Sequence, residues 1–181
     1  MMLLNKPCFC GSAQEFSSCC QPFLNQDAFP IAAEQLMRSR FSAYVLGNSQ
    51  YIYDTYAKSS QAAQSVKEIN DWANAYKWLA LKIHSAEVIN HMKRSPEQFV
   101  EFSAFYIVDE TLCELRENSR FILEVTEHSN KQEPQWRYID GDIIKHSELV
   151  KIKRNALCPC NHYATSWSLK KGKKFKQCCA K

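Results

Sequence analysis

Apolar residues recur at three- and four-residue steps in the segment after Pro30, which is the spacing of one face of an α-helix. The recurring positions are Ala33, Leu36, Met37, Phe41 and Tyr44. Gly47 follows the pattern, and glycine often ends a helix because it adopts a left-handed backbone conformation without strain. The pattern predicts an amphipathic helix over residues 31–46.

Capping residues predict two shorter helices further along the chain. Asn48 can accept a hydrogen bond at the start of a helix that runs to Tyr56. Ser65 and Glu68 have the spacing of a capping box, and apolar residues follow them at helical steps. Three helices are therefore expected in the N-terminal half of the chain.

The period of the apolar pattern changes to two from Trp78 onward, which is typical of β-strands. This alternation predicts strands over residues 78–84 and 100–108, and further strands at 112–125 and 135–140. Strands joined by short connections pair antiparallel. Helices followed by strands predict an α+β fold in which the helices pack on one antiparallel sheet.

The composition supports one packed domain with small appendages. Of the 181 residues, 45% are hydrophobic and 12% are aromatic, which suffices for one core of ordinary size. No apolar stretch approaches the ~18 residues that span a bilayer, and the N-terminus lacks the apolar core of a secretion signal. We expect a cytosolic protein without membrane insertion, in which the nine cysteines stay reduced.

The first four cysteines have the spacing of a metal site. Cys8 and Cys10 form one pair, and Cys19 and Cys20 form another after eight intervening residues. Four thiolates can surround a tetrahedral Zn²⁺ at ~2.3 Å each if the loop turns back, and Gly11 permits that turn. Free structural or reactive cysteines are the alternative interpretation.

A second cluster near the C-terminus repeats this inventory. Cys158 and Cys160 are separated from Cys178 and Cys179 by 17 residues. Roughly doubling a loop costs only about 0.6 kcal/mol, which is small against the ~10–16 kcal/mol of structural zinc binding. We expect a second zinc site here, whereas the isolated Cys113 is interpreted as a small core residue.

The C-terminal segment is also basic. Nine of the 23 Lys and Arg lie in residues 151–181, whereas all 19 Asp and Glu lie before them. The densest part consists of Lys170, Lys171, Lys173, Lys174 and Lys176. Such a patch suits phosphate backbones or an acidic protein face, and a solvated lysine-rich loop is the alternative.

Two segments resemble the SEC-C motif, which is named for the zinc-binding tail of the bacterial translocase motor SecA. They are CFCGS followed by CC within residues 8–20, and GKKFKQCC at residues 172–179. Between them stand MRSRF at 37–41, SRF at 119–121 and WRYIDG at 136–141. With these motifs the chain resembles the YchJ-like family of bacterial proteins over nearly its whole length.

The resemblance implies a nuclear transport factor-like (cystatin-like) cone of helices on a curved sheet at residues 28–150. SEC-C modules at 1–27 and 151–181 would flank it, each binding one metal ion through four cysteines. The implied ligands are Cys8, Cys10, Cys19, Cys20, Cys158, Cys160, Cys178 and Cys179. The SecA tail is associated with the chaperone SecB and with ribosomes, so the resemblance implies similar partners. Iron is the alternative metal.

The second motif departs from the family pattern. Asn161 and His162 replace the glycine and serine, and about nine residues around 163–171 are inserted. Asn161 can adopt the left-handed turn in place of glycine. His162 is an alternative metal ligand in place of one cysteine.

Catalytic chemistry in the central domain has no specific sequence signal. The polar candidates on the predicted strands are His84, Tyr106, Arg116, Glu117, Ser119, Arg120 and Asp140. Their spacing specifies no dyad or triad, so we expect Arg120 and Asp140 to form an ion pair or to cap loops. His84 is expected to lie exposed on an edge strand. Arg38 and Arg40 could bind an anion, but the expectation is that they lie on the solvated side of the first helix.

The sequence therefore favours a non-enzymatic adaptor with two zinc-ordered modules. Its basic C-terminal module would contact ribosomes, RNA or a protein-export chaperone similar to SecB. The alternative is a small-molecule-binding protein, or an isomerase- or dehydratase-like enzyme, that uses a pocket in the central cone. A closed, dry, polar-lined cavity that holds a convergent Asp or His would favour this alternative, whereas a cone filled with side chains would favour the adaptor.

Overall fold

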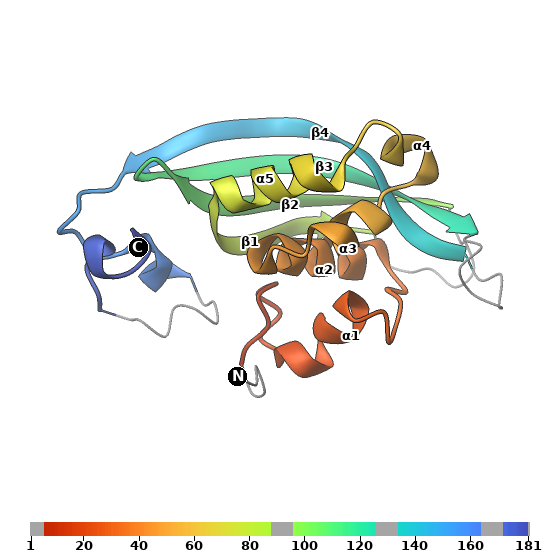
Figure 1. Ribbon diagram of the computed structural model, residues 1–181, viewed down its shortest axis with the longest axis horizontal. Helices are drawn as coiled ribbons and strands as arrows, with labels where there is room; N and C mark the ends of the chain where they lie inside the picture. The colour runs from red at the N-terminus through yellow and green to blue at the C-terminus, as the bar shows by residue number, and fades with distance from the viewer. Residues whose placement is uncertain (1–5, 88–95, 126–133, 164–171, 181) are drawn as a thin grey trace.

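The computed structural model describes residues 6–87, 96–125, 134–163 and 172–180. Within them, helices precede strands along the chain, and short 3-10 turns lie in both terminal segments (Figure 1). The α-helices are α1 (Gln21–Leu24), α2 (Ala33–Leu46), α3 (Ser49–Asp54), α4 (Lys58–Gln61) and α5 (Val66–Ala75). The strands are β1 (Lys77–Ala86), β2 (Glu97–Val108), β3 (Thr111–Val125) and β4 (Pro134–Lys151).

The three predicted helices are confirmed as α2, α3 and α5, and local signals explain their ends. α2 ends at Gly47, whose φ of 68° is left-handed. The Asn48 side chain accepts from the Tyr51 N–H at 3.1 Å, and Ser65 Oγ accepts from the Glu68 N–H at 3.1 Å. α1 and α4, of four residues each, are too short for the apolar period to reveal. No helix in the described part of the chain is long and apolar enough to cross a membrane.

The four strands form one antiparallel sheet in the order β1-β2-β3-β4, as predicted. β4 is much longer than the predicted strand at 135–140, because it continues to Lys151. Most side chains beyond Gly141 are exposed, so this half of β4 has no buried apolar alternation for the sequence to reveal. Backbone pairing with β3 holds it instead, as far as the pair Thr111 and Lys151.

Helices α2, α3 and α5 cover one face of the sheet, and the largest core lies between these two layers (Figure 1). Leu36 and Phe41 of α2 pack in one buried cluster with Trp78 of β1, Val100 of β2 and Phe121 of β3. Three register shifts between β3 and β4 increase the local twist and bend the sheet over the helices. The predicted α+β architecture is therefore confirmed.

The cysteine-bearing terminal segments pack on different sides of this domain. In the N-terminal segment, Phe16 and the cysteines share an apolar cluster with Val45 of α2. In the C-terminal segment, Phe175 shares a cluster with Ile107 of β2. The neighbouring residue on this strand, Tyr106, belongs to the core that faces the helices. Because alternate strand residues point to opposite faces, the C-terminal segment lies on the face that the helices leave open. The predicted module boundaries stay a prediction.

Candidate metal centres and central cavity

Four cysteine sulfurs meet in the N-terminal segment. The Sγ atoms of Cys8, Cys10, Cys19 and Cys20 all lie within 4.8 Å of one another. The Cys10–Cys19 distance is 3.7 Å and the Cys19–Cys20 distance is 3.9 Å. Four thiolates around one ion at ~2.3 Å stand about 3.8 Å apart in a tetrahedron. The cluster therefore has the spacing that could hold one metal ion.

Gly11 and Arg38 shape the loop that carries the first two cysteines. Gly11 has a φ of 75° and donates its N–H to the Cys8 carbonyl oxygen at 3.2 Å, so the predicted turn is confirmed. A Cβ atom on Gly11 would lie 3.4 Å from the Leu81 carbonyl oxygen, which shows how closely the loop approaches β1. Arg38 Nη1 donates to the Cys10 carbonyl oxygen at 3.0 Å and ties the loop to α2.

The C-terminal cysteines form a second cluster of similar size. The Sγ distances are 3.4 Å from Cys160 to both Cys158 and Cys178, and 3.9 Å between Cys178 and Cys179. All four sulfurs lie within 4.8 Å of one another, so this cluster also could hold a metal ion. His162 is exposed and lies outside the group, which favours four cysteines over the histidine alternative.

Asn161 supports this longer loop through its side chain. The predicted left-handed turn is wrong, because Asn161 lies in the 3-10 turn Pro159–His162 and has no positive φ. Its amide nitrogen donates to the Cys158 carbonyl oxygen at 2.7 Å, and its amide oxygen accepts from the Gly172 N–H at 2.6 Å. The side chain thus joins both ends of the inserted segment, and Gly172, with a φ of 81°, makes the left-handed turn.

The two modules repeat one local structure despite their different loops. The 3-10 turns η1 (Phe16–Ser18) and η4 (Phe175–Gln177) each begin with a buried phenylalanine. They end at Cys19 and Cys178, which share an unusual backbone conformation with φ/ψ of −113°/−91° and −131°/−103°. An antiparallel bridge accompanies each turn: Pro7 with Glu15, and Leu157 with Lys174. The insertion therefore leaves the local geometry intact.

The thiols in each cluster change one another's protonation. Hydrogen bonds from Cys20 and Cys8 lower the pKa of Cys10, and the same contacts with Cys10 raise the pKa of Cys20 and Cys8. In the second cluster, burial and a hydrogen bond to Cys158 raise the pKa of Cys160. A metal ion must displace the protons that these interactions retain, because it binds thiolates.

The basic residues of the C-terminal module come together from two segments. Lys170 and Lys171 lie outside the described residues. The Lys176 N–H donates to the Arg154 carbonyl oxygen at 3.0 Å, which places a second basic segment beside the predicted patch. We define the basic face by five exposed residues: Lys153, Arg154, Lys173, Lys174 and Lys176. The sequence did not indicate that Lys153 and Arg154 lie beside the predicted lysine patch, because this contact joins two segments that are distant along the chain.

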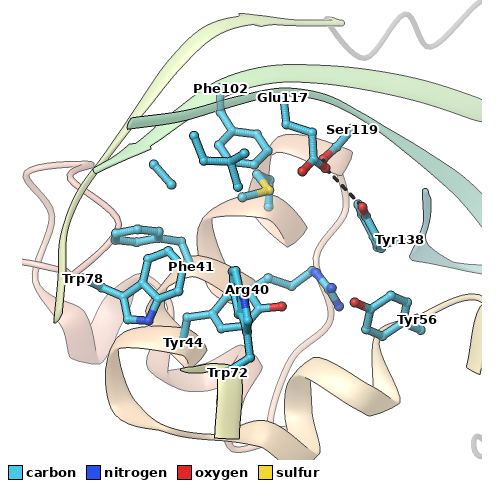
Figure 2. A pocket seen from close by; sticks show the side chains of 13 residues that line it. Arg40, Phe41, Tyr44, Tyr56, Trp72, Trp78, Phe102, Glu117, Ser119 and Tyr138 are labelled. Carbon is cyan, nitrogen blue, oxygen red and sulfur yellow. Dashed lines mark hydrogen bonds between the residues drawn. The ribbon is translucent and has the colours of Figure 1, made fainter. Parts of the chain in front are cut away.

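A cavity lies between the helices and the sheet of the central domain (Figure 2). Its volume is about 80 Å³. The polar lining comes from Arg40, Tyr44, Tyr56, Glu117, Ser119 and Tyr138, and the apolar lining includes Phe41, Trp78 and Phe102. The expectation that Arg40 is solvated is wrong, because α2 turns this side chain into the layer between helices and sheet, where it is 3% exposed.

Backbone pairing between the segment that follows α3 and strand β4 positions two of the cavity tyrosines. The Tyr138 N–H donates to the Thr55 carbonyl oxygen at 2.9 Å, and the Ala57 N–H donates to the Tyr138 carbonyl oxygen at 2.7 Å. Tyr56 therefore lies beside Tyr138, with ring centroids 5.3 Å apart. Burial raises the pKa of Tyr138, and the nearby Glu117 carboxyl raises it further. Its hydroxyl remains protonated and donates to Glu117 Oε1 at 3.1 Å.

The predicted Arg120–Asp140 ion pair is confirmed, with an N–O distance of 2.5 Å. Asp140 consequently has a lowered pKa, since its carboxylate accepts hydrogen bonds from Arg120. His84 is exposed on the edge strand β1, as expected. Glu117 and Ser119 are the two strand candidates that line the cavity, where Ser119 Oγ donates to Glu117 Oε1 at 2.6 Å.

The other strand candidates have structural partners away from the cavity lining. Arg116 pairs with Glu101 at 2.5 Å. The Tyr106 hydroxyl forms a hydrogen bond with His146, and burial raises the pKa of Tyr106 to about 12. Cys113 is buried in the main core, and burial raises the pKa of its thiol, which fits the predicted core role.

Comparison with known proteins places the chain in a family. Residues 32–141, more than half of the chain, match the family model described as YchJ, middle NTF2-like domain. The chain belongs to the YchJ-like family. Residues 5–22 match the SEC-C motif, so both the predicted nuclear transport factor-like fold and the predicted family are confirmed.

Curated relatives and solved structures extend this finding. The chain is 36% identical over 174 residues to a UPF0225 protein of Vibrio cholerae, covering 95% of this chain and 98% of that protein. A UPF0225 protein of Enterobacter sp. is 36% identical over 172 residues, covering 95% and 96%. A SEC-C motif containing protein from Psychrobacter arcticus has a similar fold, with a TM-score of 0.67, 24% identity and coverage of 99% and 98%. One from Rhodopseudomonas palustris has a TM-score of 0.64 and 23% identity, covering 76% and 98%.

Proposed function

We propose that this protein is a non-enzymatic adaptor of the reducing cytosol, whose zinc-ordered C-terminal module binds the phosphate backbone of ribosomal RNA. The observation that carries the proposal is the basic face. Its five exposed cations gather on a module without any Asp or Glu. Clustered Lys and Arg attract nucleic acid because they neutralise phosphates and release condensed counterions.

Zinc would order this module without taking part in chemistry. Zn²⁺ prefers four tetrahedral ligands when its role is structural, and four cysteines leave no position open for water or substrate. The cluster sulfurs lie beside Phe175 in one buried group, and Lys174 and Lys176 flank that phenylalanine. Metal binding would therefore fix the backbone that carries part of the basic face.

The two modules would divide the work of the adaptor. The N-terminal cluster packs on α2, whereas the C-terminal cluster packs on the opposite face of the sheet. The basic residues belong to the C-terminal module, because the N-terminal segment has only Lys6 among its first 27 residues. The N-terminal site is then a structural element, and the C-terminal site is the contact surface.

Co-sedimentation of the metal-loaded protein with ribosomes over a range of salt concentrations tests the proposal. The triple variant Lys173→Ala, Lys174→Ala, Lys176→Ala should weaken binding and flatten its salt dependence, since each lost phosphate contact lowers the slope by about 0.9. The control is Lys58→Ala, Lys67→Ala, Lys82→Ala, which removes three exposed lysines outside the module. Binding by the first variant equal to that of wild type would overturn the RNA contact.

A parallel arm uses a purified SecB-like export chaperone in place of ribosomes. An acidic protein face would also attract the basic face. Capture of the chaperone without any association with ribosomes or purified ribosomal RNA would transfer the adaptor role to a protein partner. The result that we expect is salt-sensitive binding to naked ribosomal RNA that is weakened in the first triple variant and unchanged in the control variant.

A further inference from the structure

Arg40 carries a buried charge into the central cavity. Its Nη1 donates to the Ile52 carbonyl oxygen at 2.8 Å and to Thr55 Oγ1 at 2.6 Å. The guanidinium carbon lies 4.5 Å from the centroid of the Tyr56 ring and 4.7 Å from that of Tyr138. These partners are neutral, and no carboxylate in the described part of the chain comes within 4.0 Å of the guanidinium nitrogens. A buried charge without a counter-ion is destabilising.

One edge of this guanidinium has no hydrogen-bond partner among the described residues, and Arg40 lines the cavity. No hydrogen bond involves Nε or Nη2 of Arg40 among the described residues. Among the described residues, Ser147 Oγ is the one fully enclosed side-chain N or O atom without a partner, so the unpaired Arg40 nitrogens are not completely enclosed by protein. Nε–H and one Nη2–H point in parallel, and this edge binds a carboxylate through two hydrogen bonds.

The rest of the cavity fits the body of a small aromatic molecule. Phe41, Trp78 and Phe102 supply aromatic walls, and Trp72, at 40% exposure, lies at the boundary with solvent. The cavity volume of about 80 Å³ is well below the ~300–1,000 Å³ of pockets that bury drug-sized ligands. The space therefore suits a single ring with short substituents at most, and a nucleotide or a peptide would not fit.

Glu117 presents an acceptor to the same cavity from the sheet. Its Oε1 accepts hydrogen bonds from Ser119 at 2.6 Å and Tyr138 at 3.1 Å. Figure 2 shows the Glu117 carboxylate on the sheet side and the Arg40 guanidinium on the helix side. The cavity thus offers hydrogen-bond donors from Arg40 and an acceptor from Glu117. A molecule bound between them needs an acceptor group at one end and a donor group at the other.

We propose that the cavity binds a small aromatic carboxylate that also carries a hydroxyl or amino group. The carboxylate would accept two hydrogen bonds from Nε and Nη2 of Arg40. The ring would lie against Phe41 and Phe102, and the hydroxyl or amino group would donate to Glu117. This site is separate from both cysteine clusters and from the basic face, so it adds a ligand-binding role to the adaptor.

Calorimetric titration of the full-length, metal-loaded protein with three probes tests the chemistry. 4-Hydroxybenzoate should bind, benzoate should bind several-fold more weakly, and 4-hydroxybenzamide should bind at least tenfold more weakly, because it lacks the charge that Arg40 recognises. Absence of any heat or ligand-observed NMR signal for 4-hydroxybenzoate at about 1 mM would overturn the proposal. Equal affinity for the amide would remove Arg40 as the anchor and overturn it equally.

Variants connect the binding to the cavity. Ala104→Leu places extra carbon atoms in the cavity and should abolish binding, and Arg40→Lys keeps the charge but loses the two parallel donors, which should weaken binding about tenfold. Glu117→Gln should weaken the binding of 4-hydroxybenzoate more than the binding of benzoate, because only 4-hydroxybenzoate has a hydroxyl that donates to Glu117. Arg116→Lys, which makes the same change at an arginine outside the cavity lining, should bind like wild type.

Metal content and thermal unfolding check that each variant folds. If Arg40→Lys does not fold, because Arg40 also binds the end of α3, Ala104→Leu and the amide probe decide the question. Unchanged affinity in a folded Ala104→Leu protein would show that the probe binds elsewhere, and the proposal would be wrong. The Lys173, Lys174 and Lys176 triple variant should keep wild-type affinity, which separates this site from the adaptor function.

Discussion

Arg38 on α2 donates from Nη1 to the carbonyl oxygen of Cys10 at 3.0 Å, and this contact joins the first cysteine cluster to the central domain. The same guanidinium binds Glu34 at 2.8 Å, and its side chain is 24% exposed. The loop that carries Cys8 and Cys10 is thus fixed by α2 as well as by its own turn. The N-terminal module and the central domain should therefore stabilise each other.

Replacing Arg38 by Gln should loosen the N-terminal site without unfolding the central domain. A hydrogen bond from a charged donor contributes about 1.5–3 kcal/mol, so a chelator should remove the N-terminal metal roughly tenfold faster. Stopped-flow chelation with a chromogenic chelator measures both sites. Lys67→Gln is the control, because Lys67 forms an exposed pair with Asp71 at the same helical spacing. Equal rates of metal removal in both variants would show that the Arg38 contact does not stabilise the N-terminal site.

Serine substitution in either cluster should remove one metal ion per chain. Cys8→Ser and Cys178→Ser each delete one ligand of a different quartet, so metal content should fall from two ions to one in each variant. Cys113→Ser changes a buried cysteine outside both clusters and should retain two ions. Metal analysis of freshly purified protein measures the content and identifies zinc or iron. Two ions in both cluster variants would contradict the assignment.

Metal binding should release protons, and affinity should fall as the pH is lowered. The pKa values of Cys8 and Cys20 are raised by their hydrogen bonds with Cys10, so both thiols carry protons at neutral pH in the metal-free protein. A metal ion must displace these protons, so acid opposes binding. Calorimetry in buffers of different ionisation enthalpy counts the protons, and we expect at least two at the N-terminal site. Cys8→Ser, which should lose the N-terminal ion, should release only the protons of the C-terminal site; an unchanged proton count would contradict the prediction.

Gly141→Ala should destabilise the sheet through Glu117. A Cβ atom at this position would overlap Glu117 Oε1, so the carboxylate or the backbone of β4 must move. Such overpacking costs about 1–3 kcal/mol in the free energy of unfolding. In a Glu117→Ala background the same change should cost much less, because the clash is absent. Denaturant unfolding of the four proteins of this cycle measures the difference. Equal costs in both backgrounds would show that Glu117 is not the cause.

The apolar period and the capping residues correctly predicted the longer helices, which have enough residues to show a repeating pattern. The caps at Asn48 and Ser65 and the left-handed Gly47 depend on residues three or four positions apart, so the chain itself encodes them. The long second half of β4 gave no such signal, because it pairs through its backbone and leaves its side chains exposed. The left-handed turn predicted at Asn161 was wrong for a related reason. The Asn161 side chain accepts a hydrogen bond from Gly172, eleven positions away, and no local pattern indicates such a contact.

The sequence by itself determined both cysteine quartets, the order of helices and strands, and the family, because these depend on spacing within short segments. Only the tertiary structure decided that Arg40 is buried, that Glu117 shares its cavity, and that Arg154 lies beside Lys176. The physical reason is that burial and charge pairing depend on elements packed from distant parts of the chain. No local pattern on α2 distinguishes Arg38, which reaches a loop, from Arg40, which enters the core.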